Sequence, residues 1–150
     1  IFLSRVAMGI LFFYAGITKV LNPNWSAAGY LNNAKMFPEL FQWFASASNL
    51  GWVNFVNEWG LTLVGVALVA GLLVRWASIG GILLMILFYL PVLQFPYIGE
   101  HSFLVDEHII YVAAFVVVGY TGVGKFFGVD GIPRVQKLAE RNNWLRLLTA

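Results

Sequence analysis

Long apolar stretches separated by short polar ones dominate the chain, and four of them have the length of a membrane-spanning helix. They run from about Ile1 to Leu21, from Val53 to Val74, from Trp76 to Phe95 and from Glu107 to Val123. A bilayer core needs about 20 mostly apolar residues per helix, so the pattern predicts four transmembrane helices. Within the second segment the apolar part begins at Trp59. The first segment is too long for the core of a signal peptide.

Glycines and prolines inside these segments indicate how the helices pack. Every segment contains glycine: Gly9, Gly16, Gly65, Gly71, Gly80, Gly81 and Gly119. In lipid, small residues let helix backbones approach closely. We therefore expect an all-α fold, a compact four-helix bundle integral to the membrane. Pro91 is predicted to kink the third helix and Pro96 to end it.

The connection between the first and second helices, residues 22–57, is long and rich in aromatic residues. They are Trp25, Tyr30, Phe37, Phe41, Trp43, Phe44, Trp52 and Phe55. Because aromatic side chains settle at the membrane interface, we expect this extracytoplasmic connection to lie on the outer surface or to dip into it. Pro38 and Glu39 are typical of the first turn of a short helix.

The end of the chain, GIPRVQKLAERNNWLRLLTA, is basic and amphipathic. Pro133 can open a helix. The apolar residues available for contact are Val135, Leu138, Trp144, Leu145 and Leu148. An anionic membrane surface and a partner subunit explain this segment equally well. We divide the chain into a transmembrane domain, residues 1–124, and a basic cytoplasmic tail, residues 125–150.

Composition supports a membrane protein and excludes several classes of site. The chain is 60% hydrophobic and 11% charged, whereas soluble domains are about 25% charged. It has no cysteine, which excludes disulfides, cysteine-ligated zinc and iron–sulfur clusters. No run of Lys and Arg suggests nucleic acid as a partner.

Basic residues gather on one side of the predicted bundle. That side carries Arg5, Arg75, Lys125, Arg134, Lys137, Arg141 and Arg146, and the other side has Lys19 and Lys35. The positive-inside rule therefore predicts that both termini are cytoplasmic, and an even number of spans agrees with that. We expect a multi-pass protein of a prokaryotic cell membrane.

The candidate chemistry lies where three predicted helices reach the outer face. VDEHIIY, residues 105–111, begins the fourth helix, Lys19 ends the first, and Glu58 lies early in the second. Ionisable groups in membrane segments are costly unless paired or hydrated, and they often mark function. The candidate ligand-binding residues are Lys19, Trp25, Glu58, Trp59, Asp106, Glu107, His108 and Tyr111, with Trp43 as a further covering residue. Of these, Glu58, Glu107 and His108 are the candidate catalytic residues.

Helical geometry limits how this cluster can be arranged. Asp106, Glu107 and His108 span about 200° of helix circumference, so they cannot all face the interior. Glu107 and Tyr111 share one face, and His108 lies between them. Asp106 suits the helix cap or its first turn.

Several roles for the cluster stay open from the residues alone. Lys19 can pair with Glu58 or Glu107 and hold the helices together, or the cluster can bind a small polar or quinone-like ligand and pass protons to it. Haem clamped from both faces is excluded, because His101 and His108 are the only histidines and share one side of one segment. A single haem or pigment ligand remains open. We predict no metal site, although Glu100, His101, Asp106 and His108 could converge in a folded loop.

The chain resembles the DoxX-like family of small membrane proteins, which includes the DoxD-type subunit of thiosulfate:quinone oxidoreductases. The matching pieces, in the family's order, are RVAMGILFFYAGITKV, WSAAGYL, EWGLTLVGVALVAGLLVRWAS and VDEHIIY, followed by GYTGVGKFFGVDG. The resemblance implies a four-helix bundle and a link to sulfur compounds or quinones at the membrane. It also implies that thiosulfate oxidation needs a partner subunit or an external redox group.

Two functional hypotheses are consistent with these features. The first is a membrane subunit of a quinone-linked oxidoreductase, in which Lys19 attracts an anion such as thiosulfate or a quinone oxygen. The second is a non-catalytic structural or assembly subunit of a larger respiratory or photosynthetic complex. A transporter or channel is disfavoured, because polar residues are scarce at the mid-depth of every span.

Overall fold

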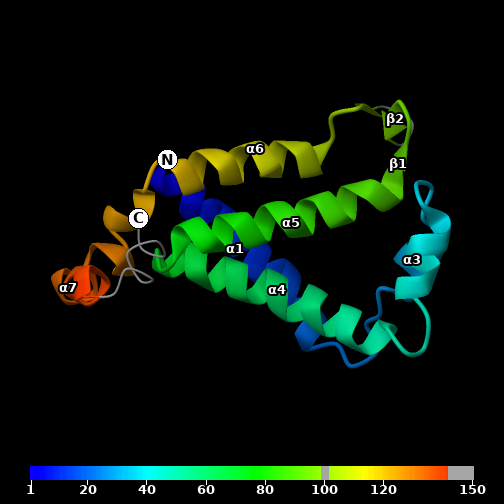
Figure 1. The fold of residues 1–150 in the computed structure, drawn as a ribbon, viewed down its shortest axis with the longest axis horizontal. Coiled ribbons are helices and arrows are strands. Elements are labelled where there is room, and N and C mark those ends of the chain that lie inside the picture. Colours follow the sequence, from blue (N-terminus) through cyan, green and yellow to red (C-terminus); the bar gives the residue numbers. More distant parts are fainter. Residues whose placement is uncertain (99–101, 142–150) are drawn as a thin grey trace.

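Helices dominate the structure, a computed structural model that describes residues 1–98 and 102–141 (Figure 1). The four longest are α1 (Phe2–Val20), α4 (Leu50–Ala70), α5 (Val74–Val92) and α6 (Glu107–Tyr120). Helix α1 packs chiefly against α4, and α6 packs chiefly against α5. The main core between them includes Phe12, Leu68 and Phe115, all nearly inaccessible to solvent.

Three helices, α1, α4 and α5, are long and apolar enough to cross a membrane. The predicted fourth span is the apolar helix α6, which has 14 residues. At 1.5 Å per residue it is about 21 Å long, whereas the hydrocarbon core is about 30 Å thick. The described residues therefore contain three full-length candidate spans and one shorter apolar helix.

The predicted helix ends differ from the observed ones at the turn between α4 and α5. Helix α4 stops at Ala70, because Gly71 adopts a left-handed conformation with φ of 65°. Helix α5 then begins at Val74, two residues before the predicted start at Trp76. It ends at Val92 instead of Phe95, and Pro91 lies inside its last turn.

A small sheet departs from the predicted all-α fold. Strands β1 (Leu93–Gln94), β2 (Tyr97–Ile98) and β3 (Ser102–Phe103) pair antiparallel in the order β1-β2-β3. Two-residue strands carry too little periodicity to be recognised in a sequence. The sheet lies at the end of α5 that faces away from α7 (Pro133–Arg141), as Figure 1 shows.

The aromatic connection folds into two short helices, α2 (Ala28–Asn32) and α3 (Pro38–Phe44). It is shorter than predicted, because its last residues, 50–57, form the first two turns of α4, which begins at Leu50 instead of Val53. Pro38 and Glu39 occupy the first turn of α3, which confirms their predicted role. In Figure 1, α3 lies at the end of the molecule where α4 and α5 diverge. Ala27, Leu31, Ala34 and Phe41 are buried there in a second apolar cluster.

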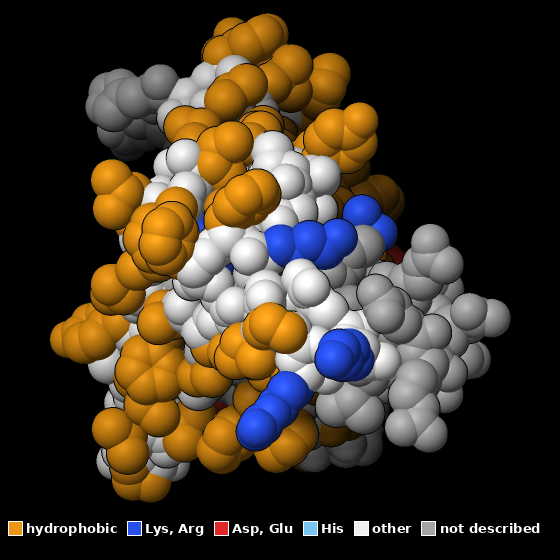
Figure 2. All heavy atoms as spheres, turned by 90° about the vertical axis from the view of Figure 1, so that its left-hand side faces the viewer, with side chains coloured by type: hydrophobic (Ala, Val, Ile, Leu, Met, Phe, Trp, Pro, Cys, Tyr) orange, Lys and Arg blue, Asp and Glu red, His pale blue; other side chains and the backbone are white. Residues whose placement is uncertain are grey.

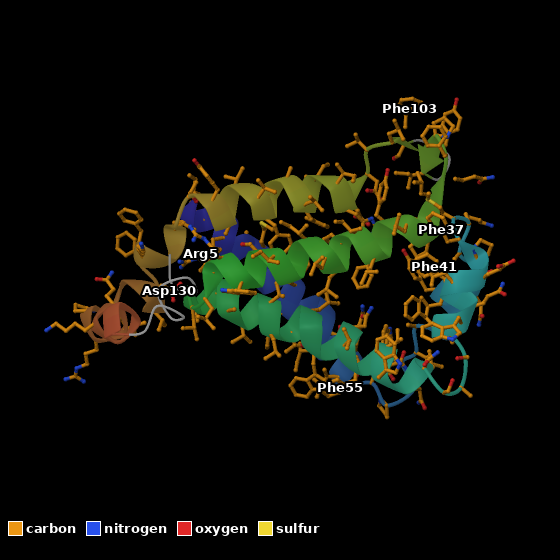
Figure 3. The ribbon with its side chains drawn as sticks, viewed as in Figure 1. Arg5, Phe37, Phe41, Phe55, Phe103 and Asp130 are labelled. Atoms are coloured by element: carbon orange, nitrogen blue, oxygen red, sulfur yellow. The ribbon has the colours of Figure 1, made fainter. Side chains whose placement is uncertain are left out.

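The opposite end is closed by a buried polar cluster beside the turn from α4 to α5. Arg5 is 0% exposed, and its guanidinium donates to the carbonyls of Val123 (3.0 Å) and Phe127 (3.1 Å). Asp130 is 2% exposed and accepts from the backbone N–H groups that begin α5, at Leu73 (3.0 Å) and Val74 (3.3 Å). Figure 3 shows Arg5 and Asp130 together at this end. Asp130 thus caps α5 from a distant part of the chain.

This cluster joins the segment after α6 to the helices. The segment contains the 3-10 turns η1 (Val123–Lys125) and η2 (Val129–Gly131), and it precedes α7. The predicted domain boundary after residue 124 falls inside η1. Pro133 opens α7 as expected, while Trp144, Leu145 and Leu148 lie outside the described residues.

Glycines allow α1 and α4 to pack backbone to backbone. A Cβ on Gly65 would collide with the backbone of Phe13, whereas a Cβ on Gly51, in the same helix, would meet nothing within 4 Å. We expect Gly65→Ala to lower the free energy of unfolding by about 1–3 kcal/mol through overpacking. Gly51→Ala should leave it unchanged or raise it by up to about 1 kcal/mol. Unfolding by SDS titration in mild detergent measures both, and equal effects would show that the close packing is not required.

Candidate ligand-binding site

A polar chamber lies where α1, α2, α4, α5 and α6 meet, near the sheet end of the molecule. Its volume is about 450 Å³. It is lined by Lys19, Trp25, Ser26, Ala27, Tyr30, Asn57, Phe88, Val92, Glu107 and His108. The chamber thus brings an ammonium group, a carboxylate and an imidazole together among aromatic rings.

Lys19 is held by a hydrogen bond and by two aromatic rings. Its Nζ donates to Asn57 Oδ1 over 2.8 Å. The same atom lies 4.7 Å from the ring centroid of Trp25 and 5.5 Å from that of Phe88. Cation–π attraction of this kind stabilises a desolvated ammonium group. Lys19 Nζ is therefore surrounded by an amide oxygen and two aromatic rings inside the chamber.

The ion pair from Lys19 to Glu58 or Glu107, one of the two roles left open by the sequence, does not form. Across residues 1–98 and 102–137, the only ion pair within 4.0 Å joins His108 and Asp106. The amide of Asn57 occupies the position next to Lys19 Nζ instead. Lys19 consequently has N–H donors left for a further acceptor.

His108 is oriented by the residue that caps its own helix. Asp106 Oδ1 accepts from the backbone N–H of His108 (3.0 Å) and Ile109 (3.3 Å), which confirms the expected cap. Asp106 Oδ2 lies 2.6 Å from His108 Nδ1. A carboxylate on one ring nitrogen fixes the orientation of an imidazole and leaves the other nitrogen for chemistry. The His108 ring also packs edge-on against Phe88.

Tyr30 supplies a permanent hydrogen-bond donor to the chamber wall. Its hydroxyl donates to the carbonyl of Phe88, which ties α2 to α5. Burial raises the pKa of Tyr30 to about 12, and the nearby charge of Asp106 adds to the shift. The phenol therefore stays neutral throughout the physiological range, and this contact does not depend on pH.

More than half of the sequence matches a known protein family. The family model described as DoxX matches residues 1–92. The chain belongs to the DoxX family. Neither a comparison with curated proteins nor one with solved structures gives a match.

The DoxX match confirms the resemblance inferred from the sequence and, with the three apolar helices, indicates a membrane protein. Its 92 residues run from α1 to the end of α5. They include Lys19, Trp25, Asn57 and Phe88 of the polar chamber. Glu107 and His108 lie beyond the matched region, so the match covers the Lys19 side of the chamber and not the α6 side.

Four residues predicted from the sequence lie away from the chamber lining in this DoxX protein. Trp59 is 39% exposed and packs beside Phe55, and Tyr111 packs edge-on against Phe12 in the main core. Glu58 is half-buried, and its carbonyl accepts from the Thr62 hydroxyl. Trp43 packs on Phe44 within α3. Lys19, Trp25, Glu107 and His108 are the predicted residues that line the chamber, and Asp106 acts through His108.

Two important residues that line the polar chamber were not predicted from the sequence. Asn57 accepts from Lys19, and Phe88 provides the ring between Lys19 and His108. Asn57 is an uncharged amide just before an apolar segment. A polar residue at that position could have been recognised as a candidate site residue. Phe88 is one of many apolar residues of α5, and no local pattern marks it.

A metal site at this cluster would need several ligands close together. Among the residues that the structure describes, no three His, Asp or Glu side chains are grouped to hold a metal ion. Glu100 and His101 lie outside the described residues. His108 is a chamber residue whose Nδ1 contacts Asp106.

Proposed function

We propose that this DoxX protein binds a quinone headgroup in the polar chamber, as the membrane subunit of a quinone-linked oxidoreductase. One observation carries the proposal: Lys19, Glu107 and His108 line a single chamber together with the rings of Trp25 and Phe88. Cations and imidazoles donate hydrogen bonds to carbonyl oxygens, and aromatic faces stack on a flat ring. A quinone offers two carbonyl oxygens on such a ring.

The same groups suit the proton chemistry of quinone reduction. A quinone becomes a quinol by taking up two electrons and two protons, one at each oxygen. Lys19 stabilises the negative charge that develops on one oxygen. His108, oriented by Asp106, donates a proton to the other oxygen, and Glu107 at the chamber wall relays protons from the aqueous side.

The electrons come from a partner. The chain has no cysteine to hold an iron–sulfur cluster or a covalent sulfur intermediate. A partner subunit or an external redox group therefore supplies them, and an anionic donor such as thiosulfate is drawn toward the positive charge of Lys19. This makes the chain one subunit of a membrane complex embedded in the bilayer.

The proposal includes a topology. Helix α6 completes a transmembrane four-helix bundle, with both termini on the cytoplasmic side and the chamber near the outer surface. Support comes from the charges: Figure 2 shows Lys and Arg side chains gathered at the end that carries α7. Lys125, Arg134 and Lys137 are exposed there, as the positive-inside rule expects of a cytoplasmic face.

Lys19→Met tests the binding site. We expect the affinity for a benzoquinone to fall about 10–100-fold, because a hydrogen bond from a charged group is worth about 1.5–3 kcal/mol. Tryptophan fluorescence quenching of the purified chain in lipid nanodiscs measures the affinity, with Trp25 as the nearest reporter. The matched control is Lys35→Met, since Lys35 is exposed and does not line the chamber.

The alternative is a structural subunit, and the same titration separates the two. Saturable quenching that Lys19→Met weakens and Lys35→Met preserves supports quinone binding. If quenching is not saturable and the chain copurifies in a fixed ratio with large redox subunits, an assembly role replaces the proposed function. The exposed aromatic residues at the sheet, Phe95, Tyr97 and Phe103, then offer a docking surface.

A further inference from the structure

A second chamber lies between α4 and α5 and beneath α2 and α3. Its volume is about 140 Å³, and its wall includes Phe41, Phe44, Trp52, Val56, Leu84 and Leu87. Phe41, only 3% exposed, reaches in from α3 (Figure 3). Apart from Tyr30 and Asn57, all the side chains that line it are apolar or aromatic. We call it the apolar chamber.

The apolar chamber shares a wall with the polar one. Ala27, Tyr30, Asn57 and Phe88 line both. The Tyr30 hydroxyl donates to the Phe88 carbonyl, and Asn57 Oδ1 accepts from Lys19. Only these shared residues therefore separate a molecule bound beside Lys19 from the apolar chamber.

The apolar chamber suits hydrocarbon better than water. A cavity of about 150 Å³ lined by aliphatic and aromatic residues stays dry and binds benzene, and this chamber is of similar size. Leu84 is buried at its inner side, whereas Val56 (45% exposed) and Leu87 (48% exposed) lie at its outer side. Both are on apolar helices long enough to span a membrane, so hydrocarbon can enter from the bilayer.

We infer that the ligand is an amphiphile: its polar quinone ring lies in the polar chamber, and the first part of its hydrocarbon side chain lies in the apolar chamber, past Tyr30 and Phe88. This inference rests on the proposed function, because it requires the quinone ring to bind beside Lys19. It assigns the apolar chamber to chain recognition. It also distinguishes a lipid-soluble quinone from a small anion or a chainless ring as the preferred ligand.

The test compares two probes that differ in the chain alone: a dimethoxy-methyl-benzoquinone without a chain and the same ring with a ten-carbon chain. Val56→Phe narrows the apolar chamber from its outer side. The matched control is Val66→Phe, since Val66 lies on the same helix, is 47% exposed and lines neither chamber. Affinities are measured by fluorescence quenching in nanodiscs, as functions of quinone concentration in the lipid phase to correct for partitioning.

At equal concentration in the lipid phase, we expect the wild-type chain to bind the chain-bearing quinone at least about threefold more tightly, because van der Waals contacts with the chamber walls replace looser contacts in fluid lipid. Val56→Phe should remove this preference while leaving the affinity for the chainless ring within about twofold, and Val66→Phe should change neither. Native mass spectrometry of the same samples identifies any phospholipid that occupies the apolar chamber.

Three results would overturn the inference. Equal affinities of the wild-type chain for the two quinones would show that the apolar chamber does not recognise the chain, while the proposed function stands. If Val56→Phe displaces a bound phospholipid and leaves both quinone affinities unchanged, the chamber holds a membrane lipid instead. If neither quinone binds saturably, the proposed function fails and the inference fails with it.

Discussion

Replacing Asp130 by alanine lowers the free energy of unfolding by about 2–6 kcal/mol, because two backbone N–H groups lose their acceptor at a cost of about 1–3 kcal/mol each. The carboxylate accepts the two N–H groups that begin α5, and its negative charge acts on the guanidinium of Arg5, which is fully buried. Without Asp130, those N–H groups lose their partner, and the guanidinium charge is left with two carbonyls and an unbonded Nε. SDS titration in mild detergent, followed by circular dichroism, measures the loss.

Two further variants control this prediction. Glu39→Ala removes an exposed carboxylate from the first turn of α3 and should cost less than about 1 kcal/mol. Arg5→Met combined with Asp130→Asn should cost less than the sum of the two single changes, because neither charge is then left alone. A loss below about 1 kcal/mol for Asp130→Ala would mean that the cluster does not hold this end of the bundle together.

If His108 is the proposed proton donor, we expect His108→Gln to lower the rate of quinone reduction at saturating quinone by about 10²–10⁴-fold, the usual contribution of a positioned general acid. Glutamine keeps a polar side chain of similar reach but cannot deliver a proton. Quinone affinity should change far less, since Lys19 and the rings of Trp25 and Phe88 remain. The rate is followed by quinone absorbance in native membranes, which would also hold the electron-donating partner that the proposal requires.

The contact between Asp106 and His108 allows a second variant to test the same proton transfer. Asp106→Asn keeps an oxygen to cap α6 but weakens the hold on His108 Nδ1, so we expect a rate between those of the wild type and His108→Gln. Glu39→Gln serves as the control, because Glu39 is exposed and does not line the polar chamber. Unchanged turnover in His108→Gln, with the protein folded and the quinone bound, would exclude His108 as the proton donor.

Features encoded over one or a few turns could be predicted from the sequence. The apolar segments indicated the helices, and Glu107 was the expected first residue of α6. Asp106 followed by Glu107 and His108 indicated the helix cap, because a capping carboxylate bonds N–H groups two and three residues ahead. Lys19 was expected at the same depth as His108, and both line the polar chamber.

Features made by residues far apart in the chain could not be predicted in this way. Asp130 caps α5 although it lies 57 residues after Leu73 and 56 residues after Val74 in the sequence. The residues near Val74 therefore contain no capping pattern that predicts where the helix begins. The sequence placed Arg5 among the basic residues of the cytoplasmic side. In the structure its side chain is buried and donates to carbonyls more than 100 residues away. Asn57 replaced Glu58 as the partner of Lys19, because the helix turns the neighbouring residue away by about 100°.

The most direct test of quinone binding in the polar chamber is photoaffinity labelling with an azido-benzoquinone in native membranes, followed by peptide mass spectrometry. We expect saturable labelling of peptides that contain Trp25 and His108, competed by unlabelled quinone and strongly reduced by Lys19→Met. Labelling at the Arg5 end instead, or labelling of these peptides that is neither saturable nor reduced by Lys19→Met, would contradict the proposed site.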